Sequence, residues 1–181
     1  MENYFKQDLG QDIYLLYPDI SMASEVFALI NSDRHHLRSY LDFIDATQKV
    51  SDEENYIKSK LQGIAANTDR LYFLAYQDKI VGCIDLHCIN WQTQSAEIGY
   101  WLHSSVTGQG LMTVAVNHLV NLAFKQMGLN RLEIHAAVDN LPSNALAKRC
   151  DFRLEGCARS SRLLYGQLID MNHYAILKSD R

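Results

Sequence analysis

The sequence predicts an α+β fold in which a mixed, mostly antiparallel sheet of about seven strands is covered by helices on both faces. Three observations lead to this prediction. Some short runs alternate apolar and polar residues, which is typical of strands. Longer runs place an apolar residue every three or four positions, which is typical of amphipathic helices. The two kinds of run follow one another as strand, helices, three strands, helix, strand, helix and two strands.

The N-terminal third is predicted to hold one strand and three helices. The apolar run at 13–17 is stopped by Pro18 and predicts the first strand, after which Pro18 and Asp19 open a helix. A second helix is predicted over 34–43 from the spacing of its apolar residues. The segment Ser51-Asp52-Glu53-Glu54 fits a capping box that starts a third helix, which runs to about Ala66. The apolar faces of the first two helices carry Met22, Val26, Leu29, Ile30, Leu37, Tyr40 and Leu41.

Two predicted strands, 71–76 and 80–89, flank the polar turn Gln77-Asp78-Lys79 and form a β-hairpin. In the second strand an apolar set, which includes Cys88, alternates with Asp85 and His87. The next strand is predicted at 95–103. Together these segments form the central part of the predicted sheet.

The C-terminal half alternates helices with strands. A helix with an apolar face follows position 110 and is ended by Gly128, and a strand follows at 131–137. Asn140 and Pro142 begin a short helix that ends near Cys150. Strands at 152–157 and 168–177 complete the sheet, separated by a polar stretch that contains arginines.

Composition indicates one globular domain, residues 1–181, of which 48% are apolar and 21% charged. The formal charge is −4, from 17 basic and 21 acidic residues, and no block of Lys and Arg interrupts that balance. We therefore expect no nucleic-acid partner, and a cationic substrate fits the sign better.

Neither a signal peptide nor a membrane span is predicted. Met1–Asp8 is polar and acidic where a signal peptide needs a cationic start and an apolar run. No segment reaches the roughly 18 to 20 apolar residues of a membrane span. The cysteines show no metal or Cys-x-x-Cys spacing, so reduced, mostly buried thiols are expected in a cytoplasmic protein with no membrane partner. They are Cys83, Cys88, Cys150 and Cys157.

The turn at 107–113 is predicted to bind an anion. Gly108 and Gly110 let the backbone approach a ligand closely, and the free N–H groups of the first helical turn can hold a phosphate. No Lys-Ser or Lys-Thr follows, so the turn is not a P-loop, and Gly-x-Gly-x-x-Gly is incomplete because position 113 is Thr.

Four segments, 96–102, 108–110, 128–131 and 139–144, resemble the GNAT acetyltransferases. Within that family the chain is most similar to the RimL/RimJ branch of ribosomal-protein N-terminal acetyltransferases, down to its tail at 154–157. The resemblance implies central strands that splay apart at the glycine turn and admit the pantetheine arm of acetyl-CoA. It also implies a possible homodimer.

The resemblance assigns the cofactor site to a splayed strand, the glycine turn and the short helix at 141–150. The phosphate loop maps to 107–112 and departs from the family pattern at Thr107 and Met112, while Asp151 replaces a glycine. A backbone N–H at 101–103 would polarise the thioester carbonyl. As alternatives, Asn140 is an ordinary helix cap, and Lys148 only interacts with the helix dipole. The implied cofactor residues are Trp101, Leu102, His103, Thr107, Gly108, Gln109, Gly110, Leu111, Met112, Thr113, Asn140 and Lys148.

Two residues are candidates for catalysis. Glu97 would accept the proton of the attacking amine, directly or through a water; otherwise it is a solvated residue or a salt-bridge partner. Ser143 would protonate the departing thiolate of coenzyme A; otherwise it caps a helix. We expect no metal, because the seven histidines show no ligand spacing.

Aromatic and basic residues near this site have two interpretations. Tyr100 and Trp101 are expected to pack under the cofactor as core aromatics. Arg159, Arg162 and Tyr165 lie in the polar stretch and either line the acceptor cleft or are solvated surface, which is the reading slightly favoured.

The predicted function is acetyl transfer from acetyl-CoA to a primary amine by direct attack in a ternary complex. No cysteine lies in an obvious nucleophile setting, so an acetyl-enzyme is unnecessary. The leading acceptor is the N-terminal α-amine of a protein, and the resemblance indicates a ribosomal one. The alternatives are a small amine, such as a polyamine, amino acid or antibiotic, and a non-catalytic acyl-CoA-binding module.

Overall fold

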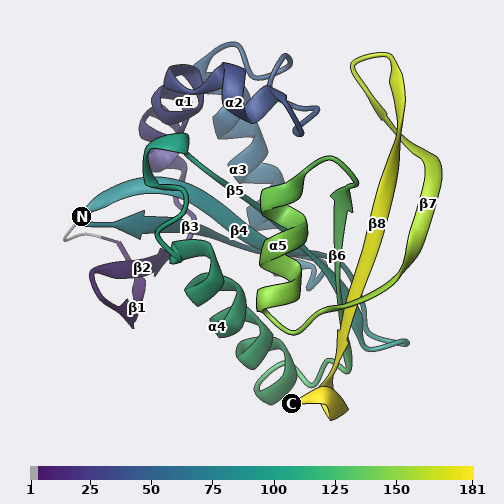
Figure 1. Ribbon diagram of the computed structural model, residues 1–181. Helices are drawn as coiled ribbons and strands as arrows, with labels where there is room; N and C mark the ends of the chain where they lie inside the picture. The colour runs from purple at the N-terminus through teal and green to yellow at the C-terminus, as the bar shows by residue number, and fades with distance from the viewer. Residues whose placement is uncertain (1–3) are drawn as a thin grey trace.

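The computed structural model describes residues 4–181, which form one eight-stranded sheet with helices on both faces (Figure 1). The strand order is β1-β2-β3-β4-β5-β6-β8-β7, and β5 and β6 are the parallel pair in an otherwise antiparallel sheet. The predicted mixed fold is confirmed, with one strand more than expected. The strands are β1 (Lys6–Gly10), β2 (Ile13–Leu16), β3 (Arg70–Tyr76), β4 (Lys79–Asn90), β5 (Ser95–Leu102), β6 (Arg131–Ala137), β7 (Arg153–Leu164) and β8 (Gln167–Leu177). The α-helices are α1 (Ala23–Ser32), α2 (Arg34–Arg38), α3 (Val50–Ala65), α4 (Leu111–Lys125) and α5 (Leu141–Arg149).

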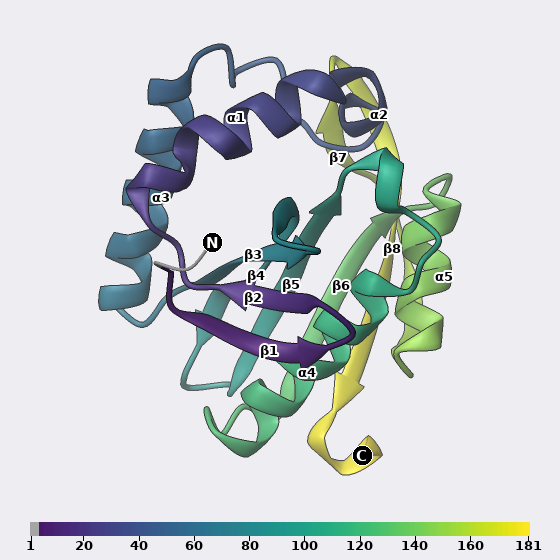
Figure 2. The same cartoon turned by 90° about the vertical axis from the view of Figure 1, so that its left-hand side faces the viewer.

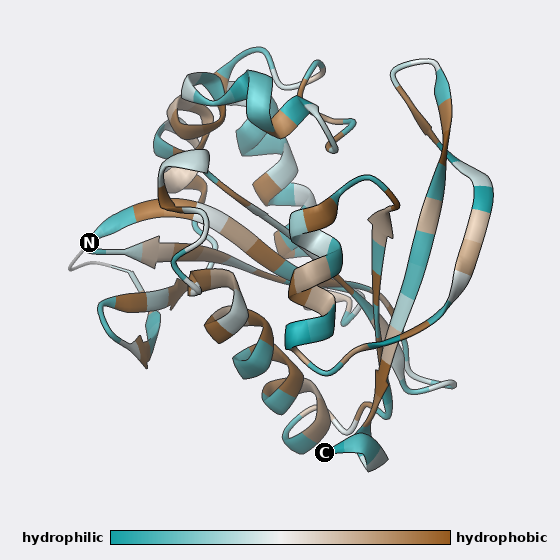
Figure 3. Cartoon of the chain, in the orientation of Figure 1, coloured by the Kyte–Doolittle hydropathy of each residue, from teal (hydrophilic) through white to brown (hydrophobic). Residues whose placement is uncertain are grey.

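The sheet separates two apolar layers. On one face α1, α2 and α3 pack Val26, Leu37 and Ile57 against β2, β3 and β4. On the other face α4 and α5 pack Val116 and Leu146 against the central strands. Figure 2 views the sheet from its β1–β2 end and shows α1 and α3 on the opposite side from α4. Figure 3 shows that the brown, apolar sides of α4 and the central strands face inward.

The sheet opens between β5 and β6. Their parallel pairing covers only Ser95–Glu97 against Arg131–Glu133, whereas β5 stays paired with β4 as far as Leu102. The edge of β5 beyond residue 97 therefore presents backbone groups that β6 does not satisfy. This is the splay that the family resemblance implies.

Two predicted helix boundaries were wrong. The helix predicted over 34–43 ends at Arg38, and beyond its end the Tyr40 hydroxyl donates to the Asp139 carbonyl, 3.1 Å away. The capping box was placed too late. Helix α3 begins at Val50, and the Asp52 carboxylate accepts from the amides of Lys49 and Gln48 at 3.0 and 2.9 Å.

Three strand predictions also needed correction. Strand β1 was missed because nearly all its residues are exposed, which leaves no apolar alternation to detect. Cys88 has φ +52° at an irregularity in β4 and is exposed, as is Cys157, so only two of the four thiols are buried. The polar stretch after 157 is the continuation of β7. It belongs to the outer part of the β7–β8 hairpin, residues 158–170, called here the β7–β8 arm, where most residues are exposed.

Two local features agree with the sequence analysis. The residues Gln77 and Asp78 form the two-residue turn between β3 and β4, with φ of +48° and +60°. Asp151 adopts φ +65°, the left-handed conformation of the glycine that it replaces.

None of the helices within residues 4–181 combines the length and apolar character needed to cross a bilayer. The expectation that the N-terminal segment is not a signal peptide rests partly on residues 1–3, which lie outside the described part of the chain.

Candidate active site

The glycine turn and the first turn of α4 present free backbone amides, which are called here the amide cradle. Gly108 and Gly110 have φ of +76° and +82°, a region that disfavours residues with a Cβ. The first helical donor is the amide of Val114, which donates to the Gly110 carbonyl at 3.1 Å. The amides of residues 111–113 therefore have no intrahelical acceptor and point to the N-terminal side of a 15-residue helix, which suits a phosphate.

The segment just before this turn is anchored to Asp33, between α1 and α2. The Asp33 carboxylate accepts from the Ser104 amide at 2.6 Å and from the Ser104 hydroxyl at 2.8 Å. The Thr107 hydroxyl donates to the Ser104 carbonyl at 2.9 Å. Thr107 thus stabilises the turn from within, so its departure from the family pattern is compatible with the cradle.

A groove of about 540 Å³ runs from this turn along the open edge of β5 to the start of α5. Nine of the twelve predicted cofactor residues line the groove. His103, Gln109 and Lys148 do not, and Arg149 lines it where Lys148 was expected. The residues in common are Trp101, Leu102, Thr107, Gly108, Gly110, Leu111, Met112, Thr113 and Asn140.

Among the backbone amides of residues 101–103, the one that faces the opening belongs to Leu102. The His103 amide donates to the Val81 carbonyl at 2.9 Å, so it is already used by the sheet. Because successive N–H groups of a strand point to opposite edges, Trp101 also faces β4, whereas Leu102 faces the opening. The imidazole of His103 is engaged as well, 3.1 Å from the Ser32 hydroxyl and 2.8 Å from the Ser105 hydroxyl.

A second cavity, of about 460 Å³, lies on the α3 face of the sheet and holds Glu97. It meets the groove at a set of residues that line both. This junction lies where the sheet opens, so a group threaded through the splay reaches the second cavity. The shared residues are Tyr40, Leu41, Tyr100, Trp101, Asn140 and Ser143.

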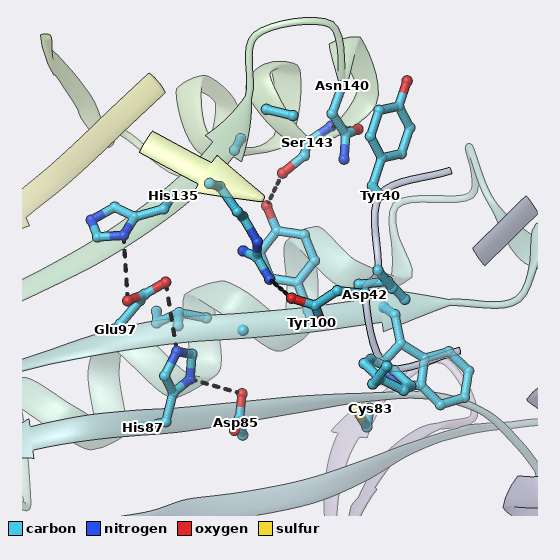
Figure 4. A pocket seen from close by; sticks show the side chains of 18 of the residues that line it. Tyr40, Asp42, Cys83, Asp85, His87, Glu97, Tyr100, His135, Asn140 and Ser143 are labelled. Carbon is cyan, nitrogen blue, oxygen red and sulfur yellow. Dashed lines mark hydrogen bonds and ion pairs between the residues drawn. The ribbon is translucent and has the colours of Figure 1, made fainter. Parts of the chain in front are cut away.

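Ser143 presents its hydroxyl at this junction. Its oxygen lies 2.7 Å from the Tyr100 phenol oxygen (Figure 4). The helix cap is Asn140, whose side chain accepts from the Ser143 amide at 3.2 Å, so the alternative that Ser143 is the capping side chain was wrong. Burial raises the pKa of Tyr100 to about 12, so the phenol keeps its proton at neutral pH and can support the serine hydroxyl.

Glu97 lies between two histidines from neighbouring strands (Figure 4). Its carboxylate oxygens are 3.5 Å from His87 Nε2 on β4 and 3.3 Å from His135 Nδ1 on β6. Strand register explains the grouping, because His87 pairs with Glu97 across β4–β5 and the parallel β6 brings His135 to the same face. The salt-bridge alternative for Glu97 is therefore confirmed, and its catalytic role stays a prediction.

The histidines set the charge state of Glu97. Burial would raise the pKa of Glu97, but the two imidazoles outweigh it and the net shift is downward. Burial would likewise lower the pKa of His87, but the Asp85 and Glu97 carboxylates raise it to about 10. Glu97 is thus an anion paired with an imidazolium at neutral pH.

Two further charged residues extend this pair into a charge row that consists of Lys60, Asp85, His87 and Glu97. Asp85 lies 3.3 Å from His87 Nδ1 and 2.8 Å from the Lys60 ammonium of α3. Gly99 makes room for it, since a Cβ there would lie 2.5 Å from an Asp85 oxygen. Donor atoms of His87, Cys88 and Glu97 lie within 4.8 Å of one another, a possible metal grouping. However, both His87 nitrogens already face carboxylates, which accounts for the cluster without a metal.

The β7–β8 arm closes one side of the second cavity. Arg162 lines the cavity and pairs with Asp42 at 3.1 Å, while 40% of its side chain stays exposed, so it borders the cavity and remains partly solvated. The Tyr165 hydroxyl donates to the Leu41 carbonyl at 2.6 Å, and the Arg38 guanidinium lies 3.7 Å from the centre of its ring. These contacts join the arm to the segment after α2, a long-range contact with no local sequence signal.

Comparisons with known proteins agree with this geometry. The N-acetyltransferase YdaF of Bacillus subtilis is 37% identical over 107 residues, so the alignment spans 59% of this chain and 58% of that protein. The ribosomal-protein-serine acetyltransferase of Escherichia coli is 29% identical over 150 residues, 83% of this chain and 84% of that protein. The structure of RimL, a ribosomal L7/L12 alpha-N-protein acetyltransferase in complex with coenzyme A, has a TM-score of 0.92 at 25% identity, covering 96% of this chain and 98% of that one.

The family assignment comes from a direct match over most of the chain. Residues 14–153 match the acetyltransferase (GNAT) domain. The matched part holds the glycine turn, the splayed strands and Ser143. The chain belongs to the GNAT family of acetyltransferases, with acetyl-CoA as co-substrate.

Proposed function

We propose that the protein transfers the acetyl group of acetyl-CoA to the N-terminal α-amine of a protein, with a ribosomal protein as the leading candidate. The names of the E. coli relative and of RimL support this acceptor. The observation that carries the proposal is the meeting of the two cavities beside Ser143, with Glu97 in the wall of the second. The groove suits the coenzyme and the second cavity suits the amine.

In this proposal each chemical step is assigned to one group of the protein. The Leu102 amide polarises the acetyl carbonyl at the open edge of β5. Glu97 receives the proton that the amine nitrogen loses as its bond to the acetyl carbon forms, directly or through a water. Ser143 gives a proton to the departing sulfur as the carbon–sulfur bond breaks, and Tyr100 supports its hydroxyl. Solvent then returns a proton to Ser143 and takes one from Glu97, which restores both groups. The amide and the free thiol of coenzyme A are the products, and no covalent enzyme species is required.

The charge state of Glu97 favours an α-amine over a lysine or a polyamine. A carboxylate whose pKa is lowered by two imidazoles is a weak base. It is suited to an amine that is already partly neutral at pH 7 to 8, and α-amino groups titrate near 7.7 to 8.0, against about 10.4 for lysine. After attack the nitrogen carries a more acidic proton, which this carboxylate can accept.

A competition between acceptors tests the proposal. Three acceptors are compared by release of coenzyme A thiol: a peptide with a free N-terminus, the same peptide N-terminally blocked but with a free lysine, and spermidine. We expect turnover of the first alone. Turnover of spermidine without the peptide would replace the protein acceptor by a small amine. Heat of acetyl-CoA binding without thiol release from any acceptor would indicate a non-catalytic binding module.

We further infer that the chain acts as a single acetyltransferase domain in the cytoplasm, as a homodimer. One sheet runs through residues 4–181, and the described cysteines are free thiols, which fits a reducing compartment. Leu163 and Leu168, paired near the tip of the β7–β8 arm, are 61% and 65% exposed and offer an apolar surface to a second subunit. Light scattering that gives a monomer mass at micromolar concentration would contradict the dimer.

A further inference from the structure

Glu53 is a buried carboxylic acid that the chemistry described above does not use. It lies on the inner face of α3 and is only 4% exposed. Within residues 4–181 its carboxyl group has neither a hydrogen-bond partner nor an ion-pair partner. Burial without a partner disfavours the charged form and raises the pKa of Glu53 to about 7.

The other acids that line the second cavity are all paired. Asp42 pairs with Arg162, Asp85 with Lys60, and Glu97 with two imidazoles. The carboxylate of Asp52 accepts the amides at the start of α3. A buried carboxyl without a partner destabilises a fold by several kcal/mol as a rough guide, so its presence needs an explanation.

The Glu53 carboxyl faces the cavity. Glu53 is among the residues that line it. Within the described residues, every side-chain nitrogen or oxygen that is completely buried has a hydrogen-bond partner. The unpaired oxygens of Glu53 must therefore keep a small exposed area, and the cavity is the surface available to them.

Glu53 lines the same cavity as residues of the junction where the acetyl group is expected. The lining of this cavity includes Glu53, Glu97 and Trp101, and Trp101 also lines the coenzyme groove. An acceptor that fills the cavity therefore contacts Glu53 as well as Glu97.

The surroundings indicate which group Glu53 would bind. Ile30, Phe73, Cys83 and Trp101 line the same cavity, and all are buried. An apolar wall favours a small neutral donor, which only has to form a hydrogen bond. A cation there would have to give up its hydration in the same apolar surroundings.

We propose that Glu53 is a specificity residue that accepts a hydrogen bond from a side-chain hydroxyl on the first residue of the acceptor, so that the enzyme prefers N-terminal Ser or Thr over Ala. This inference rests on the proposed function. It adds a second contact to the acceptor, distinct from the contact of its amine with Glu97. Without the hydroxyl, the Glu53 carboxyl stays buried and unpaired, which lowers the affinity for acceptors that lack it.

Two peptides that differ only in a first-position Ser or Ala test the inference. In the wild type we expect kcat/KM for the Ser peptide to exceed that for the Ala peptide by roughly tenfold or more. Glu53→Leu, which removes the buried polar group and should fold, is expected to bring the ratio close to one. Glu53→Gln keeps an accepting oxygen and should retain part of the preference. Glu54→Gln, a neighbouring change on α3 outside the cavity lining, should leave the ratio unchanged.

The outcomes separate this inference from the proposed function. An unchanged ratio in folded Glu53→Leu, or no preference in the wild type, overturns the role of Glu53 and leaves the protein acceptor standing. If neither peptide is acetylated, the protein acceptor fails, and ethanolamine is compared with propylamine, which has a methyl in place of the hydroxyl. A preference for ethanolamine that Glu53→Leu removes supports the role of Glu53. An unchanged preference, or no reaction with either amine, overturns it.

Discussion

The hydroxyl oxygen of Ser143 lies 2.7 Å from the phenol oxygen of Tyr100, across the opening between β5 and α5. One residue comes from the sheet and the other from the helix that follows β6. Their contact lies where the coenzyme groove meets the acceptor cavity. The pair therefore offers a proton donor at the point where the acetyl group is expected to pass from the coenzyme to the acceptor amine.

Removal of either hydroxyl should slow the chemical step. Ser143→Ala is expected to lower kcat by roughly 10² or more with little change in acetyl-CoA affinity, because acid catalysis contributes about 10² to 10⁴. Tyr100→Phe should lower kcat less, because the serine hydroxyl remains. Calorimetry and thiol release, measured on both variants, separate binding from turnover. A Ser143→Ala enzyme with normal kcat would exclude this serine as the acid.

Loss of the Glu97 carboxylate should reduce turnover and change its pH dependence. We expect Glu97→Gln to lower kcat by roughly 10² and to move the rise of kcat/KM toward higher pH, where more of the amine is neutral. Glu133→Gln is the matched control, because Glu133 also contacts His135, at 3.1 Å, but does not line the acceptor cavity. Equal losses in the two variants would mean that Glu97 only supports the charge row.

The left-handed glycine at the start of α4 should be required for coenzyme binding. Gly110→Ala forces a Cβ onto a residue with φ +82°, which costs roughly 1 to 2 kcal/mol if the turn keeps its shape. We expect acetyl-CoA affinity to fall at least tenfold as the turn relaxes and its amides move. Gly10→Ala, with φ +83° in the distant β1–β2 turn, should cost similar stability without loss of affinity. Titration calorimetry of both variants decides, and equal affinities would contradict the amide cradle.

The charge row predicts a loss of stability at alkaline pH. Folding raises the pKa of His87 from its usual 6.5 to about 10. A raised folded-state pKa stabilises the fold fully below pH 6.5, and this contribution declines as the pH rises from there to about 10. His87→Gln should therefore flatten the pH dependence of the free energy of unfolding across that range. Urea denaturation at pH 6, 8 and 10 measures it, with the exposed His35→Gln as the control, and parallel curves for wild type and His87→Gln would refute the pairing.

Local patterns were sufficient for most of the fold and for the coenzyme side of the site. Alternation and helical spacing depend on neighbouring residues, so β3 to β6 and α4 could be predicted from the chain. The glycine turn was predictable because a positive φ and free helix-start amides are local properties. Prediction failed where local signals were weak, in the solvated β1 and in the outer part of β7 after residue 157.

Tertiary structure alone decided how the acceptor side is built. His87, Glu97 and His135 are distant in sequence and meet only because strand register brings them to one face. The pairing of Tyr100 with Ser143, and of Arg162 with Asp42, likewise depends on how the sheet, α5 and the arm pack. The sequence by itself determined the family and the place of the coenzyme, because short motifs encode the backbone shape that holds a phosphate. The electrostatic state of Glu97 and the isolation of Glu53 came from the tertiary structure, because both depend on burial and on contacts between residues far apart in the chain.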